Sequence, residues 1–130
     1  MAVTCVYTCR FKQDVEASFG MTCTTVMGEE GLVELGARCN LIVCATTSKK
    51  PLLYARHLQP GTHVTAMGAD GNGKQELDVS VYKVADLVVA DSKDQCCEFG
   101  DISCVASVLT WPPGCLHDLT RCCWVVPLHE

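Results

Sequence analysis

A glycine-rich loop at residues 68–74 (GADGNGK) holds the residues best suited to chemistry in this chain of 130 residues. Gly68, Gly71 and Gly73 permit positive φ angles and a close approach of the backbone to a ligand. Asp70 stands among them, and a carboxylate in such a loop can act as a general base or orient a water molecule. The same composition is typical of a solvated turn, so the spacing alone leaves both interpretations open.

Eleven cysteines are the second chemical feature of the sequence. Their number is odd, and Cys5 and Cys44 lie in apolar, strand-like runs where a free thiol serves as a small core residue. Because the N-terminus does not read as a secretory signal, we expect reduced cysteines in a cytoplasmic protein. The adjacent pair Cys96-Cys97 lacks the C-x₂₋₄-C spacing of zinc sites. Cys5 and Cys9 fit that spacing but are interpreted as a core pair on a strand, so no metal site is predicted.

The overall composition excludes two classes of partner. The formal net charge is -5 and the few basic residues are scattered, which gives no electrostatic reason to bind nucleic acid or an anionic membrane. No apolar run approaches the roughly 20 residues that a membrane-spanning helix needs. A hydrophobic content of 48% predicts one folded domain rather than a disordered chain.

The elements that must position the loop follow from apolar periodicity, which predicts strands alternating with helices. Strands are expected at residues 3–8, 22–27, 40–45, 62–67 and 87–90, and helices at 11–19, 28–38, 77–85, 93–99 and 102–109, with a short helical turn at 53–58. This order predicts an α/β fold: a mostly parallel sheet with helices on both faces. Ligands bind beyond the carboxyl ends of such strands, which selects the loops 8–10, 46–51, 67–74 and 91–92.

Residues 60–78, PGTHVTAMGADGNGKQELD, resemble the signature of the ornithine cyclodeaminase/mu-crystallin family. Residues 41–53, 84–92 and 98–103 resemble neighbouring segments of that family in the same order, and the resemblance covers most of residues 5–119. It implies a Rossmann-type domain that accompanies an N-terminal dimerisation and substrate domain. It also implies enzymes that use bound NAD to oxidise an amino acid to an imine, which in ornithine cyclodeaminase leads to proline and ammonia.

The resemblance further implies roles for particular residues. Asp70 matches the catalytic acid/base of the cyclodeaminase and alanine dehydrogenase branches, whereas the mu-crystallin branch has another residue there. The positions expected beside the nicotinamide are Thr46, Ala66, Met67 and Gly68. Thr8 and Arg10 match the site that reads the adenosine ribose, where an Arg can accommodate a 2′-phosphate, so the cofactor is NAD or NADP. Arg10 is equally compatible with an ordinary solvated position at a helix start.

The family pattern also has a part that this sequence lacks. A first strand and a G-x-G-x-x-G turn should precede residues 3–8, and no such motif occurs in the chain. We therefore expect a partial nucleotide-binding domain at residues 1–119 followed by a divergent tail at 120–130, a truncated homologue with little or no activity alone. A sheet without its first strand exposes an edge that invites pairing, so a homo-oligomer is expected, unless the tail covers that surface.

Two alternatives stay open at this point. One is a non-catalytic protein of mu-crystallin type that binds NADP or another small ligand. The other is a subunit that acts on a small amino acid or imine only after assembly with another chain.

Overall fold

The computed structural model describes the backbone of residues 2–3, 8–105, 116–118 and 124–127, and the side chains of residues 10–92 and 94–104. Its contacts divide the chain into two compact units, Met1–Cys39 and Asn40–Glu130. Each unit combines helices with strands, and most of the strand pairs are parallel, which confirms the predicted α/β class with a mostly parallel sheet.

The first unit contains two short strands and two helices. Its elements are β1 (Ala2–Val3), α1 (Thr8–Phe19), β2 (Thr24–Thr25) and α2 (Gly28–Arg38). Strands β1 and β2 pair in parallel. Helix α1 ends at Gly20, which adopts a φ of 62° and donates its N–H to the carbonyl of Glu16 at 3.1 Å. Helix α2 carries Glu29 and Glu30 in its first turn, where the helix dipole favours negative charge.

The helix predicted at 28–38 is confirmed, and the strand predicted at 22–27 is present in a shorter form. The loop predicted at 8–10 is wrong, because Thr8 begins α1 and Arg10 lies in its first turn. No Gly or Pro interrupts the chain between Thr8 and Phe19, so nothing local stops the helix from starting upstream of Phe11. The middle of the strand predicted at 3–8 lies outside the described residues.

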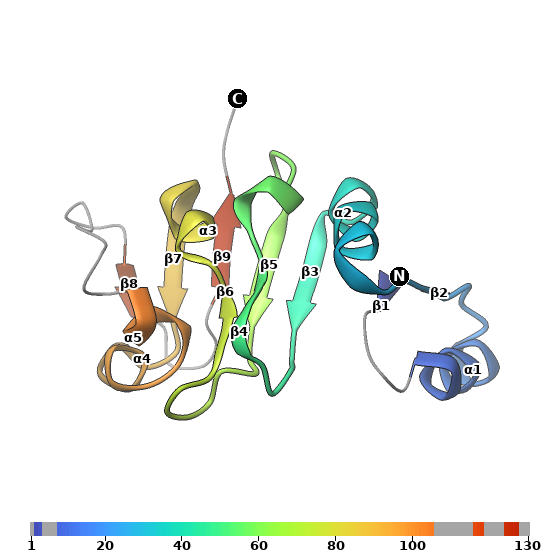
Figure 1. Cartoon of the computed structure of the whole chain (residues 1–130), viewed down its shortest axis with the longest axis horizontal. Helices are drawn as coiled ribbons and strands as arrows, with labels where there is room; N and C mark the ends of the chain where they lie inside the picture. Colours follow the sequence, from blue (N-terminus) through green and yellow to red (C-terminus); the bar gives the residue numbers. More distant parts are fainter. Residues whose placement is uncertain (1, 4–7, 106–115, 119–123, 128–130) are drawn as a thin grey trace. The chain divides into compact units, whose positions relative to one another are not determined.

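The second unit is built on a five-stranded sheet (Figure 1). Its strands, in spatial order, are β3 (Leu41–Cys44), β5 (His63–Ala66), β9 (Trp124–Pro127), β7 (Ala85–Ala90) and β8 (Leu116–Asp118). The pairs β3–β5 and β7–β8 are parallel, whereas β9 runs antiparallel to both β5 and β7. Residues 124–127 of the expected tail therefore form an inner strand of the sheet.

Strand β3 lies at the edge of this five-stranded sheet and buries one of its faces. Ile42 is 6% exposed, whereas Leu41 and Val43 are 60% and 58% exposed. Successive side chains of a strand point to opposite faces, so Leu41 and Val43 share the open one. This edge strand therefore has one buried face and one exposed face.

A second, two-stranded parallel sheet pairs β4 (Lys49–Leu53) with β6 (Gln75–Leu77). The sequence did not predict it: β4 falls across the expected loop at 46–51, and β6 overlaps the start of the helix expected at 77–85. That helix is the shorter α3 (Val79–Lys83), which begins after Asp78 because the Asp78 carboxylate accepts the N–H of Ser80 at 2.9 Å. Leu53 and Leu77 from the two strands are almost fully buried in the core.

Three further helical elements complete the second unit. The turn predicted at 53–58 is the 3₁₀ helix η1 (Ala55–His57). The helix predicted at 93–99 is α4 (Lys93–Glu98), and Ser92 caps it by accepting the N–H of Gln95 at 3.4 Å. Helix α5 (Asp101–Val105) packs against α4 and β6, and α3 packs against β7. Within the described part of the chain, no helix is long and apolar enough to cross a membrane.

Candidate functional site at the carboxyl ends of the strands

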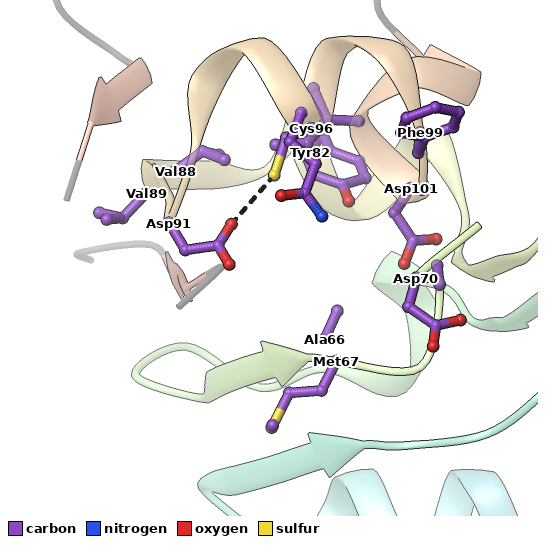
Figure 2. Close-up of a pocket in the computed structure, with 14 residues that line it drawn as sticks. Ala66, Met67, Asp70, Tyr82, Val88, Val89, Asp91, Cys96, Phe99 and Asp101 are labelled. Carbon is purple, nitrogen blue, oxygen red and sulfur yellow. Dashed lines mark hydrogen bonds between the residues drawn. The ribbon is translucent and has the colours of Figure 1, made fainter. Parts of the chain in front are cut away.

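A pocket opens where β5 and β7 end, as expected for a sheet of this type. It encloses about 180 Å³, which is below the roughly 300–1,000 Å³ of sites that enclose a drug-sized ligand and suits one ring or a small acid. Ala66 and Met67 form one side of it, and Asp91 and Cys96 lie opposite (Figure 2). The remaining lining residues named in the figure are Asp70, Tyr82, Val88, Val89, Phe99 and Asp101.

Asp70 lies at the rim of this pocket, in the loop that follows β5 (Figure 2). Its side chain is 70% exposed and forms an ion pair with Lys74. The hydrogen bond from Lys74, reinforced by the charge of the ammonium group, holds the pKa of the Asp70 carboxyl below its usual range. Asp70 is therefore a carboxylate at neutral pH, able to accept a proton or a hydrogen bond.

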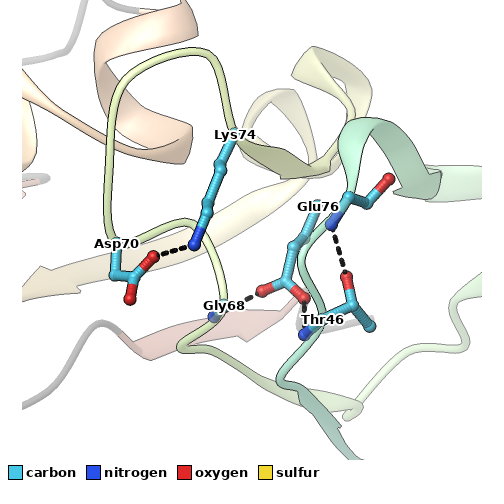
Figure 3. Close-up of polar contacts among 6 residues, drawn as sticks. Thr46, Gly68, Asp70, Lys74 and Glu76 are labelled. Carbon is cyan, nitrogen blue, oxygen red and sulfur yellow. Dashed lines mark hydrogen bonds and ion pairs between the residues drawn. The ribbon is translucent and has the colours of Figure 1, made fainter.

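The base of the Asp70 loop touches the loop that follows β3. A Cβ atom on Gly68 would overlap the backbone of Thr46 and would lie 2.5 Å from the Glu76 carboxylate, so only glycine fits this position. The Glu76 carboxylate accepts the N–H of Thr46 at 2.5 Å and the N–H of Gly68 at 2.7 Å (Figure 3). Gly68 thus allows its backbone to lie close to the neighbouring loop, whereas the predicted approach of this backbone to a ligand stays a prediction.

A second carboxylate supports this arrangement from α5. Asp101 is buried, and its Oδ1 accepts the backbone N–H groups of Glu76 at 2.7 Å and Leu77 at 2.8 Å. Burial raises the pKa of the Asp101 carboxyl, and the nearby charge of Glu76 acts in the same direction. Gly100 precedes it with a φ of 84°, and a Cβ there would overlap the carbonyl oxygen of Ala69. The Asp70 loop is thus packed between Thr46 and Gly100.

Two cysteines lie near the site. The Cys96 thiol is 3.4 Å from Oδ1 of Asp91 across the pocket wall (Figure 2). Cys44 ends β3, and burial, with the charges of Glu76 and Asp101, raises its pKa to about 12. A thiol that is so difficult to ionise is a poor nucleophile, which agrees with the structural role predicted for Cys44. Among the described residues, no group of three or more His, Cys, Asp or Glu side chains could hold a metal ion.

The structure brings most of the predicted positions together. Ala66, Met67 and Asp70 line one pocket, and Gly68 links their loop to Thr46. Thr8 and Arg10 belong to the other unit, at the start of α1, and are described there by themselves.

Sequence reasoning missed Glu76 and Asp101. The one local signal for Glu76 was a carboxylate directly before the buried Leu77.

Comparison with known proteins gives a consistent result. The model of the ornithine cyclodeaminase/mu-crystallin family matches residues 4–118. The chain is 45% identical over 74 residues to an alanine dehydrogenase of Archaeoglobus fulgidus, covering 57% of this chain and 23% of that protein. It is 51% identical over 47 residues to an iminosuccinate reductase of Paracoccus denitrificans, covering 36% of this chain and 15% of that protein.

Two solved structures are also similar. An archaeal alanine dehydrogenase dimer with bound NAD superposes with a TM-score of 0.72 at 32% identity, covering 92% of this chain and 36% of that one. The Paracoccus denitrificans iminosuccinate reductase in complex with NAD+ gives a TM-score of 0.71 at 30% identity, covering 83% of this chain and 32% of that one. The 130 residues thus span about a third of the length of these relatives.

Proposed function

The chain belongs to the ornithine cyclodeaminase/mu-crystallin family, and from that premise we propose that it carries the nicotinamide end of an NAD(P) site together with an acid/base carboxylate. The reaction proposed is the oxidation of a small amino acid to an imine, or its reverse, with deamination as the cyclodeaminase outcome. Three relatives support this chemistry by name: an alanine dehydrogenase, an iminosuccinate reductase and a ketimine reductase.

One observation carries the proposal: the anchored loop places Asp70 beside a ring-sized pocket at the carboxyl end of β5. The residues present fit a neutral or cationic ring better than a phosphate, because the N–H groups of Thr46 and Gly68 are already bound by Glu76. Ala66, Met67 and Gly68 would hold the nicotinamide, which supplies a hydride acceptor or donor when bound. Asp70 would move the proton to or from the substrate nitrogen or a water molecule.

The residues of the pocket do not include a site for the cofactor pyrophosphate. The sequence has no G-x-G-x-x-G motif for the pyrophosphate, and we propose that turnover by these 130 residues alone is slow. Assembly into a homo-oligomer is part of the proposal, supported by the dimer seen for the archaeal relative.

Nucleotide titration tests the cofactor proposal. NADH and NADPH are added while energy transfer from the two tryptophans to the nicotinamide is recorded. Saturable transfer is expected, and Ala66→Leu, which fills the pocket, should remove it. Ala37→Leu on the exposed surface of α2 is the matched control. Failure of both nucleotides to give a saturable signal would overturn the proposal.

Turnover tests the role of Asp70. Reduction of NAD+ or NADP+ is followed with alanine as substrate. Release of ammonia is followed with ornithine, because formation of proline returns the hydride and leaves no net reduction of the nucleotide. Asp70→Asn should lower the rate about 10²-fold or more, the usual contribution of a general acid or base. Asp14→Asn on α1 serves as the exposed control. An undiminished rate in Asp70→Asn would rule out this role.

A further inference from the structure

Glu76 is a carboxylate buried on β6, with none of its surface exposed. Burying a charged group is unfavourable unless hydrogen bonds replace its hydration. Here the two carboxylate oxygens serve separate partners: Oε1 accepts from Thr46 and Oε2 accepts from Gly68 (Figure 3). One side chain thus joins two loops that are 22 residues apart in the sequence, counting from 46 to 68.

The two partners occupy equivalent positions. Strands β3 and β5 pair in parallel up to Cys44 opposite Ala66, and Met67 still donates its N–H to the carbonyl of Cys44 at 2.8 Å. Thr46 and Gly68 each lie two residues beyond the strand ends, where the ladder stops. The carboxylate of Glu76 therefore accepts backbone N–H groups just beyond the point where backbone pairing between the two strands ends.

Close packing of the two backbones fixes the spacing of these loops. The missing Cβ of Gly68 lets its backbone lie directly against that of Thr46. Glu76 is itself held through its backbone N–H by Asp101 at the start of α5. The loops are thus held by packing at Gly68 and by two hydrogen bonds that they donate to a carboxylate whose residue α5 fixes in place.

We propose that Glu76 is a positioning residue that holds the loops 45–48 and 67–70 together and so sets where Asp70 and the pocket backbone of residues 66–68 lie. The proposal rests on the function proposed above. It also defines the ligand chemistry: with both N–H groups occupied, this edge receives an uncharged or cationic part of a ligand rather than a phosphate or carboxylate.

Hydrogen exchange of backbone amides, read by NMR on the unliganded chain, tests the proposal without requiring nucleotide binding. Glu76→Gln keeps the side-chain volume but replaces one acceptor by an NH₂ donor, so one of the two amides loses its partner. Hydrogen exchange at the amide of Thr46 or Gly68 should accelerate about tenfold to hundredfold, and exchange at the amides of residues 69–70 should accelerate with it. Glu98→Gln, an exposed position at the end of α4, is the matched control and should change neither.

A merely structural role would give a different pattern. General destabilisation accelerates exchange in β7 at Val88–Ala90 as much as in the loops, and that result would overturn the proposal, as would unchanged exchange at both amides. If Glu76→Gln does not fold, Gly68→Ala pushes the same loops apart while keeping the carboxylate, and the same local acceleration is expected. If the wild-type chain binds nucleotide, either variant should weaken that binding at least tenfold. If the wild-type chain binds no nucleotide, the proposed function is refuted, and the hydrogen-exchange result alone decides the role of Glu76.

Discussion

Asp101 accepts the backbone N–H of Glu76 at 2.7 Å, so one buried carboxylate holds the residue whose own carboxylate ties two loops together. This series connects α5, β6 and the ends of β3 and β5 through hydrogen bonds to backbone N–H groups. Because backbone amides cannot rotate away as side chains do, the arrangement leaves the two loops little conformational freedom.

Two replacements of Asp101 should distinguish the contribution of its hydrogen bonds to stability from the contribution of its charge. Asp101→Ala leaves the N–H groups of Glu76 and Leu77 without their acceptor and should lower the free energy of unfolding by about 1–3 kcal/mol for each. Asp101→Asn keeps an acceptor oxygen and should cost much less. Urea denaturation of the three proteins measures the difference, and equal losses in both variants would contradict this account.

The stability of the wild-type chain should also depend on pH through Asp101. Its pKa is raised in the folded state, so between the ordinary pKa of an aspartate and the raised value the folded chain binds more protons than the unfolded chain. The contribution of Asp101 to stability is therefore present at low pH and is lost as the pH rises through its folded pKa. Urea midpoints measured across this window should fall less steeply in Asp101→Asn than in wild type; parallel slopes would exclude Asp101 as the source.

Lys74 should control the ionisation of Asp70. The hydrogen bond and charge of Lys74 lower the pKa of Asp70, so Lys74→Met should raise that pKa toward its usual range. A titration of the Asp70 carboxyl carbon by NMR reads the change directly. Lys83→Met at the end of α3 is the control and should leave Asp70 unaffected; an unmoved pKa in Lys74→Met would show that the ion pair does not persist in solution.

Gly100 should tolerate alanine less well than Gly73. Both have positive φ angles, 84° and 70°, so alanine costs about 1–2 kcal/mol at either position. Only at Gly100 does the new Cβ overlap the carbonyl of Ala69, which should add about 1–3 kcal/mol, whereas Gly73 has open space around it. Thermal and urea denaturation of the two variants test this, and equal destabilisation would show that the Ala69 contact is unimportant.

Cysteine alkylation should follow ionisation and exposure. With a pKa of about 12, Cys44 is a thiolate in only about one molecule in 10⁴ at pH 8. Exposed Cys97 and Cys104 should react with iodoacetamide well before Cys44, which should be modified only on unfolding. Peptide mapping by mass spectrometry gives the order, and early modification of Cys44 in the folded chain would contradict its burial beside two carboxylates.

Removal of residues 120–130 tests the expectation that this tail covers part of the sheet. Strand β9 (Trp124–Pro127) pairs with both β5 and β7, so a chain ending at residue 119 loses an inner strand and exposes two unpaired edges. Aggregation and loss of cooperative melting are expected, followed by light scattering and circular dichroism. A soluble monomer that melts as the full chain does would show that this pairing contributes little.

The sequence by itself determined the features that depend on local patterns. The helix at 28–38 and the strands that end near Cys44 and Ala66 followed from periodicity and residue type, because each depends on neighbours along the chain. The motif at residues 60–78 identified the family, which the match over residues 4–118 confirms, and it singled out the Asp70 loop.

Only the tertiary structure decided which distant groups meet. The β4–β6 pair, the place of β9 between β5 and β7 and the open face of Leu41 and Val43 depend on pairing across the fold, which apolar runs do not encode locally. The same holds for Glu76, whose partners lie 30 and 8 residues away. In the sequence, a carboxylate in a short polar run is interpreted as a solvated side chain. Glu76 holds the two loops of the site together only because folding buries it against two backbone amides that lie beyond the paired strands.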